Sequence, residues 1–355
     1  MRQILSLGFC LLFSCSILGQ ESVRVSTDRS KNLSEVFNGT IQSESPGGIV
    51  LKATDGKTTT FSPLDILMVQ YKHESLARLD FQMVYDRQLQ AQTATSAKDQ
   101  ADRLKQAEIA ATKLLDEAGR PAIVRYARFK LAQIRSDMAR AAGKDSEILS
   151  TWKQTALEVK GGWEELPALK ALAEIQESQG SADVLTTYET MSKLTGLPPV
   201  LAQRVGYLLA AQLLRKGKPA DALARLKALP SSPETTLLVA CANLGPAGKG
   251  VADLRQAMAN ATDGHLIAIA CNHLGETLLA DKNSDDAFWE FVRVEAQFPG
   301  DPAELARALF QLGTLYDTVA KDPKRATECL ERLKSREFSS SPFQKKALQL
   351  KAPAA

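Results

Sequence analysis

The chain has 355 residues, of which 44% are hydrophobic and 24% are charged. This length accommodates two domains, or one domain followed by an extended repeat array, and the hydrophobic content excludes a disordered protein. The 44 basic and 41 acidic side chains leave a net charge of only +3. The composition therefore indicates no electrostatic attraction to nucleic acid or to an anionic membrane surface.

The first 20 residues have the composition of a secretory signal peptide. The chain starts with one arginine, Arg2, and the segment from Ile4 to Leu18 is apolar apart from Ser, Gly and Cys. This segment is shorter than the roughly 20 residues that a membrane-spanning helix needs. We therefore expect residues 1–20 to be removed on export to the periplasm or cell envelope, with cleavage near Ser16 or Gln20.

A second interpretation of the same segment rests on Leu12 to Cys15, which resembles the lipobox of bacterial lipoproteins. In that motif the cysteine is acylated and becomes the first residue of the mature chain. Phe13 departs from the usual pattern. Cys15 is thus a candidate lipidation site, and ordinary cleavage is the alternative.

Three cysteines remain once the signal is removed: Cys241, Cys271 and Cys329. Their spacing matches no metal site, and each lies in an apolar helical run. We expect them to be small buried side chains, with one Cys241–Cys271 disulfide as the alternative.

Residues 21–73 show the alternation and the regular turn residues of short β-strands. Asp55-Gly56 suits the tight turn of a hairpin. Five strands are predicted, at residues 23–25, 36–41, 49–51, 58–61 and 66–71. This layout resembles the small five-stranded β-barrels of the Sm-like and Src-homology-type folds. Because the segment has neither clustered basic residues nor an aromatic row, we expect a structural or docking module and no RNA site.

From residue 74 to residue 350 the strand signals stop, and paired amphipathic segments follow, separated by Gly, Pro, Asp or Ser. In the clearest pair, Leu274-Gly275 lies on the first helix, Ala287 lies on the second, and Pro299 ends the unit. This run resembles the tetratricopeptide repeat, in which small residues let the two helices of a hairpin pack closely.

The same anchors recur in two further units, and degenerate units lie between and before them. The resemblance implies a mainly α fold over residues 74–350: a right-handed superhelix of about six or seven antiparallel helical hairpins, with residues 351–355 as a disordered tail. The residues expected to pack the repeats are Leu209, Ala210, Ala222, Leu274, Gly275, Ala287, Leu312, Gly313 and Ala326.

No motif in the sequence indicates catalysis. The three histidines, His73, His265 and His273, lack the spacing of a zinc site, and there is no phosphate-binding loop, dinucleotide fingerprint or nucleophile elbow. The adjacent carboxylates Glu164 and Glu165 are expected at the start of a helix, where negative charge is favourable. We therefore expect neither an enzyme nor a metal or other cofactor.

The resemblance implies a binding surface on the concave face, formed by the first helix of each hairpin. Counted from Gly275 and Gly313, the expected partner-binding residues are Asn272, Glu276, Arg307, Gln311, Thr314 and Asp317. The expected function is a non-catalytic scaffold of the bacterial cell envelope that holds a partner protein or peptide. One alternative is a lipid-anchored factor in outer-membrane or envelope biogenesis, for which Cys15 is the discriminating residue. The other is an enzyme whose site is assembled from non-contiguous residues.

Overall fold

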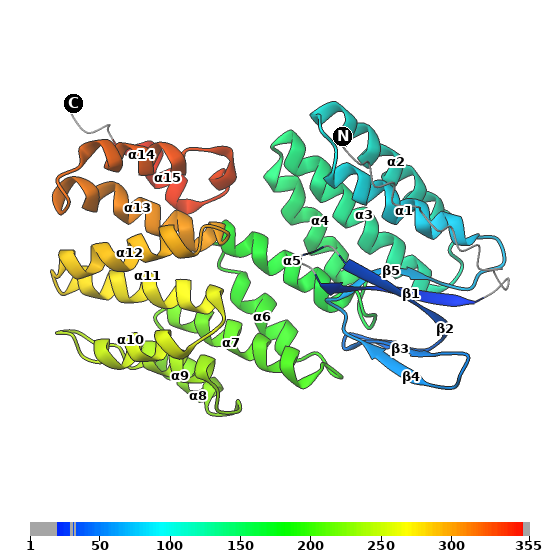
Figure 1. Cartoon of the computed structure of the whole chain (residues 1–355), viewed down its shortest axis with the longest axis horizontal. Helices are drawn as coiled ribbons and strands as arrows, with labels where there is room; N and C mark the ends of the chain where they lie inside the picture. The colour runs from blue at the N-terminus through cyan, green and yellow to red at the C-terminus, as the bar shows by residue number, and fades with distance from the viewer. Residues whose placement is uncertain (1–19, 29–30, 32, 351–355) are drawn as a thin grey trace, which may run out of the picture.

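The computed structural model describes residues 20–28, 31 and 33–350. The candidate lipidation site Cys15, nearly all of the predicted signal peptide and the predicted tail at 351–355 lie outside the described residues. Figure 1 shows a small β-sheet beside the first helices, followed by a stack of paired helices that continues to the C-terminal end. No helix in the described ranges is long and apolar enough to cross a membrane.

Five strands form one antiparallel sheet with the order β4-β3-β2-β1-β5. Their bounds are Glu21–Asp28 (β1), Leu33–Ser45 (β2), Gly48–Lys52 (β3), Thr58–Phe61 (β4) and Ile66–Gln70 (β5). The first half of β2 pairs with β1, and its second half pairs with β3. The strand changes partner at Gly39, where a Cβ atom would lie 2.3 Å from the carbonyl oxygen of Lys52, so the crossing requires glycine.

The five strands that the sequence predicts are therefore confirmed, but the predicted closure into a barrel is wrong. β4 and β5 are the two edges of the sheet, and no ladder among the described residues joins them. The physical reason is that helices lie against the edge strand β5: α1 packs against it, and Lys130 of α3 donates to its Leu67 carbonyl oxygen.

The rest of the described chain is helical. The bounds are Arg78–Gln92 (α1), Ala97–Asp116 (α2), Pro121–Ala142 (α3), Asp145–Glu158 (α4), Glu165–Ser178 (α5), Val184–Ser192 (α6), Pro199–Arg215 (α7), Pro219–Leu226 (α8), Pro233–Ala242 (α9), Val251–Asn260 (α10), Gly264–Ala280 (α11), Ser284–Gln297 (α12), Pro302–Thr318 (α13), Pro323–Leu333 (α14), the short 3-10 helix Arg336–Phe338 (η1) and Pro342–Gln349 (α15). The mainly α fold is confirmed. Consecutive helices pack in pairs, from α1 with α2 to α13 with α14, and α15 covers the last pair.

Small residues lie where the paired helices approach most closely. A Cβ atom on Gly275 of α11 would lie 2.7 Å from the ring of Phe291 in α12, and one on Gly313 of α13 would lie 2.5 Å from Leu330 in α14. The other residues expected to pack the repeats are all buried: Leu209, Ala210, Ala222, Leu274, Ala287, Leu312 and Ala326.

The three described cysteines, Cys241, Cys271 and Cys329, are buried free thiols. The alternative of a Cys241–Cys271 disulfide is therefore wrong. The Cys271 Sγ atom lies 3.7 Å from the sulfur of Met258. Burial raises the pKa of each thiol to about 12, so none is a reactive thiolate at neutral pH.

Candidate functional site

A groove of about 1710 Å³ lies between the sheet, the first helical pairs and the C-terminal part of the chain. Its walls come from β1 and β2, from α1, α3, α4 and α5, and from residues 336–341. Pockets for small molecules usually have about 300–1,000 Å³. This groove is large enough for a segment of another macromolecule.

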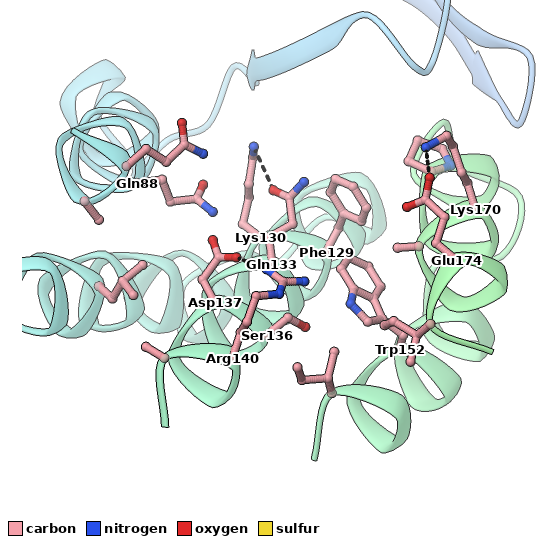
Figure 2. Close-up of a pocket in the computed structure, with 18 of the residues that line it drawn as sticks. Gln88, Phe129, Lys130, Gln133, Ser136, Asp137, Arg140, Trp152, Lys170 and Glu174 are labelled. Carbon is pink, nitrogen blue, oxygen red and sulfur yellow. Dashed lines mark hydrogen bonds and ion pairs between the residues drawn. The ribbon is translucent and has the colours of Figure 1, made fainter. Parts of the chain in front are cut away.

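The floor of the groove is one face of α3. Its lining residues recur every three or four positions, which places them in a stripe along the helix. They are Phe129, Lys130, Gln133, Ser136, Asp137, Arg140 and Ala141. At 1.5 Å per residue, the stripe from Lys130 to Arg140 is about 15 Å long. Figure 2 shows these side chains following one another along α3, with Gln88 of α1 on one side and Trp152 and Lys170 on the other.

Lys130 is the most unusual residue of this stripe because its side chain is only 5% exposed. Its Nζ atom donates to the carbonyl oxygen of Leu67 in β5 at 2.8 Å and to Oε1 of Gln133 at 3.2 Å. Burial lowers the pKa of Lys130 to about 8, and the charge of Glu164 opposes this shift. Ser136 is 3% exposed, and its hydroxyl has no hydrogen-bond partner among the described residues.

The charged side chains farther along the groove form pairs. Asp137 accepts from Arg140 at 2.9 Å on α3, and Lys170 pairs with Glu174 on α5. Burial raises the pKa of Asp137, and the neighbouring Arg140 guanidinium opposes this. These pairs line the groove with both cationic donors and anionic acceptors (Figure 2).

Aromatic rings separate the floor from the wall formed by α5. The ring of Phe129 lies edge-on to Trp152 and Trp163, with centroid distances of 5.9 and 5.6 Å. Edge-to-face packing holds large rings in defined orientations. Because the three rings are at most 5% exposed, they stiffen this part of the groove and present little apolar surface to it.

A buried charge cluster attaches the sheet to the helices beside the groove. An Nη atom of Arg125 in α3 donates to Glu44 of β2 at 2.8 Å, and the Nε atom lies 3.7 Å from Glu164. Trp163 donates to the hydroxyl of Tyr71 at 3.3 Å. Glu164 lies at the start of a helix, as predicted, at the N-cap position of α5, but its side chain makes no capping hydrogen bond and lies fully buried in this cluster.

The C-terminal segment closes one end of the groove. Arg336 of η1 donates to the carbonyl oxygen of Arg140, and Ser340 donates to Asp145 at 2.8 Å. Ser339 binds the same carboxylate. Residues almost 200 positions apart in the sequence therefore lie side by side.

None of the six residues predicted to bind a partner lines this groove: Asn272, Glu276, Arg307, Gln311, Thr314 and Asp317. Asn272 is fully buried and donates to the carbonyl and carboxylate oxygens of Glu304 at 3.0 and 2.7 Å. Arg307 forms an ion pair with Glu276. Gln311 is partly exposed, and Thr314 and Asp317 are exposed on α13. These side chains do not form a common cavity with the groove.

The groove residues carry a sequence signal of their own, which is separate from the repeat anchors. In α3, the polar positions 130, 133, 136, 137 and 140 share a face that a buried helix would fill with apolar residues.

No group of three or more His, Cys, Asp or Glu within the described ranges is arranged to hold a metal ion. No family model matches the chain, and no curated protein matches it.

Proposed function

We propose that this protein is a non-catalytic scaffold that holds an extended segment of a partner polypeptide in the groove. The observation that carries the proposal is the polar stripe along the floor, Lys130 to Arg140, in a groove too large for an ordinary small ligand. An extended chain rises about 3.3 Å per residue, so a stripe of about 15 Å spans four or five residues of a partner.

The chemistry of the stripe suits a polypeptide main chain. Gln133 and the facing Gln88 each offer both a donor and an acceptor, which is what the alternating N–H and C=O groups of an extended chain require. Leu89 of α1, which is 43% exposed, can bury an apolar side chain of the segment, whereas Phe129 and Trp152 are only 4% and 5% exposed.

We also propose that the helical pairs form a tetratricopeptide-like, right-handed superhelix. The close approach of paired helices at Gly275 and Gly313 supports it. Export to the bacterial envelope rests on the composition of residues 1–20. A lipid-anchored factor in envelope biogenesis remains the alternative, and mass spectrometry of the mature N-terminus tests it through the modification of Cys15.

A peptide selection followed by a groove-blocking substitution tests the proposed function. Dodecapeptides selected on the purified chain are synthesised, and their affinity is measured for the wild type and for Gln133→Trp. The bulky ring would fill the groove floor, so we expect binding to weaken about tenfold or more. The matched control is Gln154→Trp, which changes an exposed residue of α4 that does not line the groove. Equal loss in both variants, or a selection that returns no binding peptide, would contradict the proposal.

A further inference from the structure

Lys130 is a nearly buried cation with no carboxylate partner among the described residues. At 5% exposure, water can reach little of its side chain. The other cations of the groove lining either have carboxylate partners or are more exposed than Lys130. They are Arg140 with Asp137, Lys170 with Glu174, and the more exposed Arg24 and Arg336.

The neutral groups around Lys130 compensate its charge only in part. The carbonyl oxygen of Leu67 and the side chain of Gln133 accept two of its three N–H donors. The ring of Tyr126 lies 5.8 Å from Nζ. The carboxylate with the largest influence, Glu164, is itself close to the Arg125 guanidinium. An ammonium group removed from water without an anion is unfavourable, and the lowered pKa of Lys130 is a consequence.

We infer that the groove selects partner segments carrying an acidic side chain, whose carboxylate binds the third N–H of Lys130. This inference rests on the proposed function, because it names the chemistry that the same groove recognises. A carboxylate would supply the missing negative charge and a short charge-assisted hydrogen bond. Figure 2 shows Lys130 rising from α3 next to Gln133 and facing Gln88, so both amides can hold the main chain on either side of that carboxylate.

The position of Lys130 favours an internal side chain over a chain terminus. Besides Lys130, the groove is lined by Arg24 and Ser34 on the sheet, and by Arg140 and Ser339 near the C-terminal end of α3. A segment bound along the floor therefore continues past Lys130 at both ends. Aspartate or glutamate within the segment places a carboxylate there without interrupting the chain.

The first test observes Lys130 directly in the wild-type full chain. Lysine labelled with ¹³C at Cε is incorporated, and the Lys130 signal is assigned by its loss in Lys130→Gln. We expect N-acetyl-glutamate amide to raise the pKa of Lys130 by stabilising its cation, and N-acetyl-glutamine amide to leave it unchanged. An equal response to both compounds, or none to either, overturns the inference.

The second test uses peptides. An array of N-acetylated, C-terminally amidated octapeptides presents each sequence in a Glu and a Gln version, and a parallel set has free C-termini. We expect the wild type to prefer the amidated Glu versions about tenfold, and Lys130→Gln to lose this preference. The matched control, Lys105→Gln, changes an exposed lysine of α2 outside the groove and should retain the preference.

The outcomes separate this inference from the proposed function. Peptide binding without a preference for Glu leaves the proposed function standing and overturns the inference. Preference for free C-termini, independent of Glu, also overturns it, since the carboxylate would then be terminal. If no peptide binds, the proposed function fails. The response of Lys130 to N-acetyl-glutamate amide then shows by itself whether Lys130 binds a carboxylate.

Discussion

Arg125 lies between two carboxylates that come from distant parts of the chain. Glu44 is on β2, and Glu164 precedes α5. One guanidinium cannot fully compensate two buried negative charges, and neither oxygen of Glu164 has a hydrogen-bond partner among the described residues. Burial, together with repulsion from Glu44, raises the pKa of Glu164 to about 8, although Arg125 opposes the shift. The folded chain therefore favours the protonated form of Glu164.

This cluster predicts a pH dependence of stability. The pKa of Glu164 is about 8 in the folded chain and 4.5 in the unfolded chain. The stability that Glu164 contributes to the folded chain is therefore fully present below pH 4.5 and is lost as the pH rises to about 8. Gln has the shape of the protonated carboxyl and never ionises. We expect Glu164→Gln to increase the free energy of unfolding at pH 8.5 by about 1–3 kcal/mol, with little change at pH 5. Urea denaturation at both pH values measures this.

Two comparisons make that experiment specific. Glu147→Gln alters an exposed carboxylate of α4 and should leave the difference between the two pH values unchanged. His265 acts in the same direction as Glu164. Burial opposes its cation, but the hydrogen bond and charge of Asp301 raise its pKa overall, so its contribution is also lost as the pH rises. A residual pH dependence in Glu164→Gln is therefore expected, whereas an undiminished one would refute the role of Glu164.

At the scale of elements, the helical pairs depend on small residues at the helix contacts. The ring of Phe291 from α12 lies directly over Gly275 of α11, because no side chain keeps the helices apart there. The sequence identified this position from the Leu-small pattern alone. What it did not indicate is that the neighbouring Asn272 is buried and donates to the carboxylate of Glu304.

A larger side chain at this contact should force α11 and α12 apart. We expect Gly275→Val to lower the free energy of unfolding by about 1–3 kcal/mol, the usual cost of overpacking a well-packed core. The control is Gly300→Val, at an exposed position where an added Cβ atom meets nothing within 4 Å. Both are measured by chemical denaturation, and equal effects of the two substitutions would contradict the packing role.

At the scale of the whole molecule, the C-terminal segment that follows the last helical pair, α13 and α14, contacts the second pair, α3 and α4. Arg336, Ser339 and Ser340 contact the connection between α3 and α4. Pro342 packs close to Gly180, where an added Cβ atom would lie 2.8 Å from its ring. These contacts hold a segment that lines the groove, and the side chains of Arg336 and Ser339 that make them are exposed.

Removing the polar contacts should loosen this end without unfolding the chain. We expect the combined substitutions Arg336→Ala, Ser339→Ala and Ser340→Ala to accelerate hydrogen exchange in residues 336–345, while the melting temperature changes little, because exposed polar contacts contribute only about 0–1 kcal/mol each. Ser146→Ala, at an exposed position nearby, serves as the control. Unchanged exchange in the triple variant would mean that these contacts do not hold the segment.

The sequence by itself determined the local structure of this protein. Alternation and Asp55-Gly56 predicted the five strands, and apolar periodicity predicted the helices, because strand, turn and helix each depend on residues a few positions apart. Only the tertiary structure decided that the sheet stays open, that Lys130 reaches the carbonyl oxygen of Leu67, and that residues 336–341 meet α3 and α4. These contacts join residues that are far apart in the sequence. Whether such residues meet depends on the packing angles between the intervening elements, and a local sequence pattern does not determine those angles.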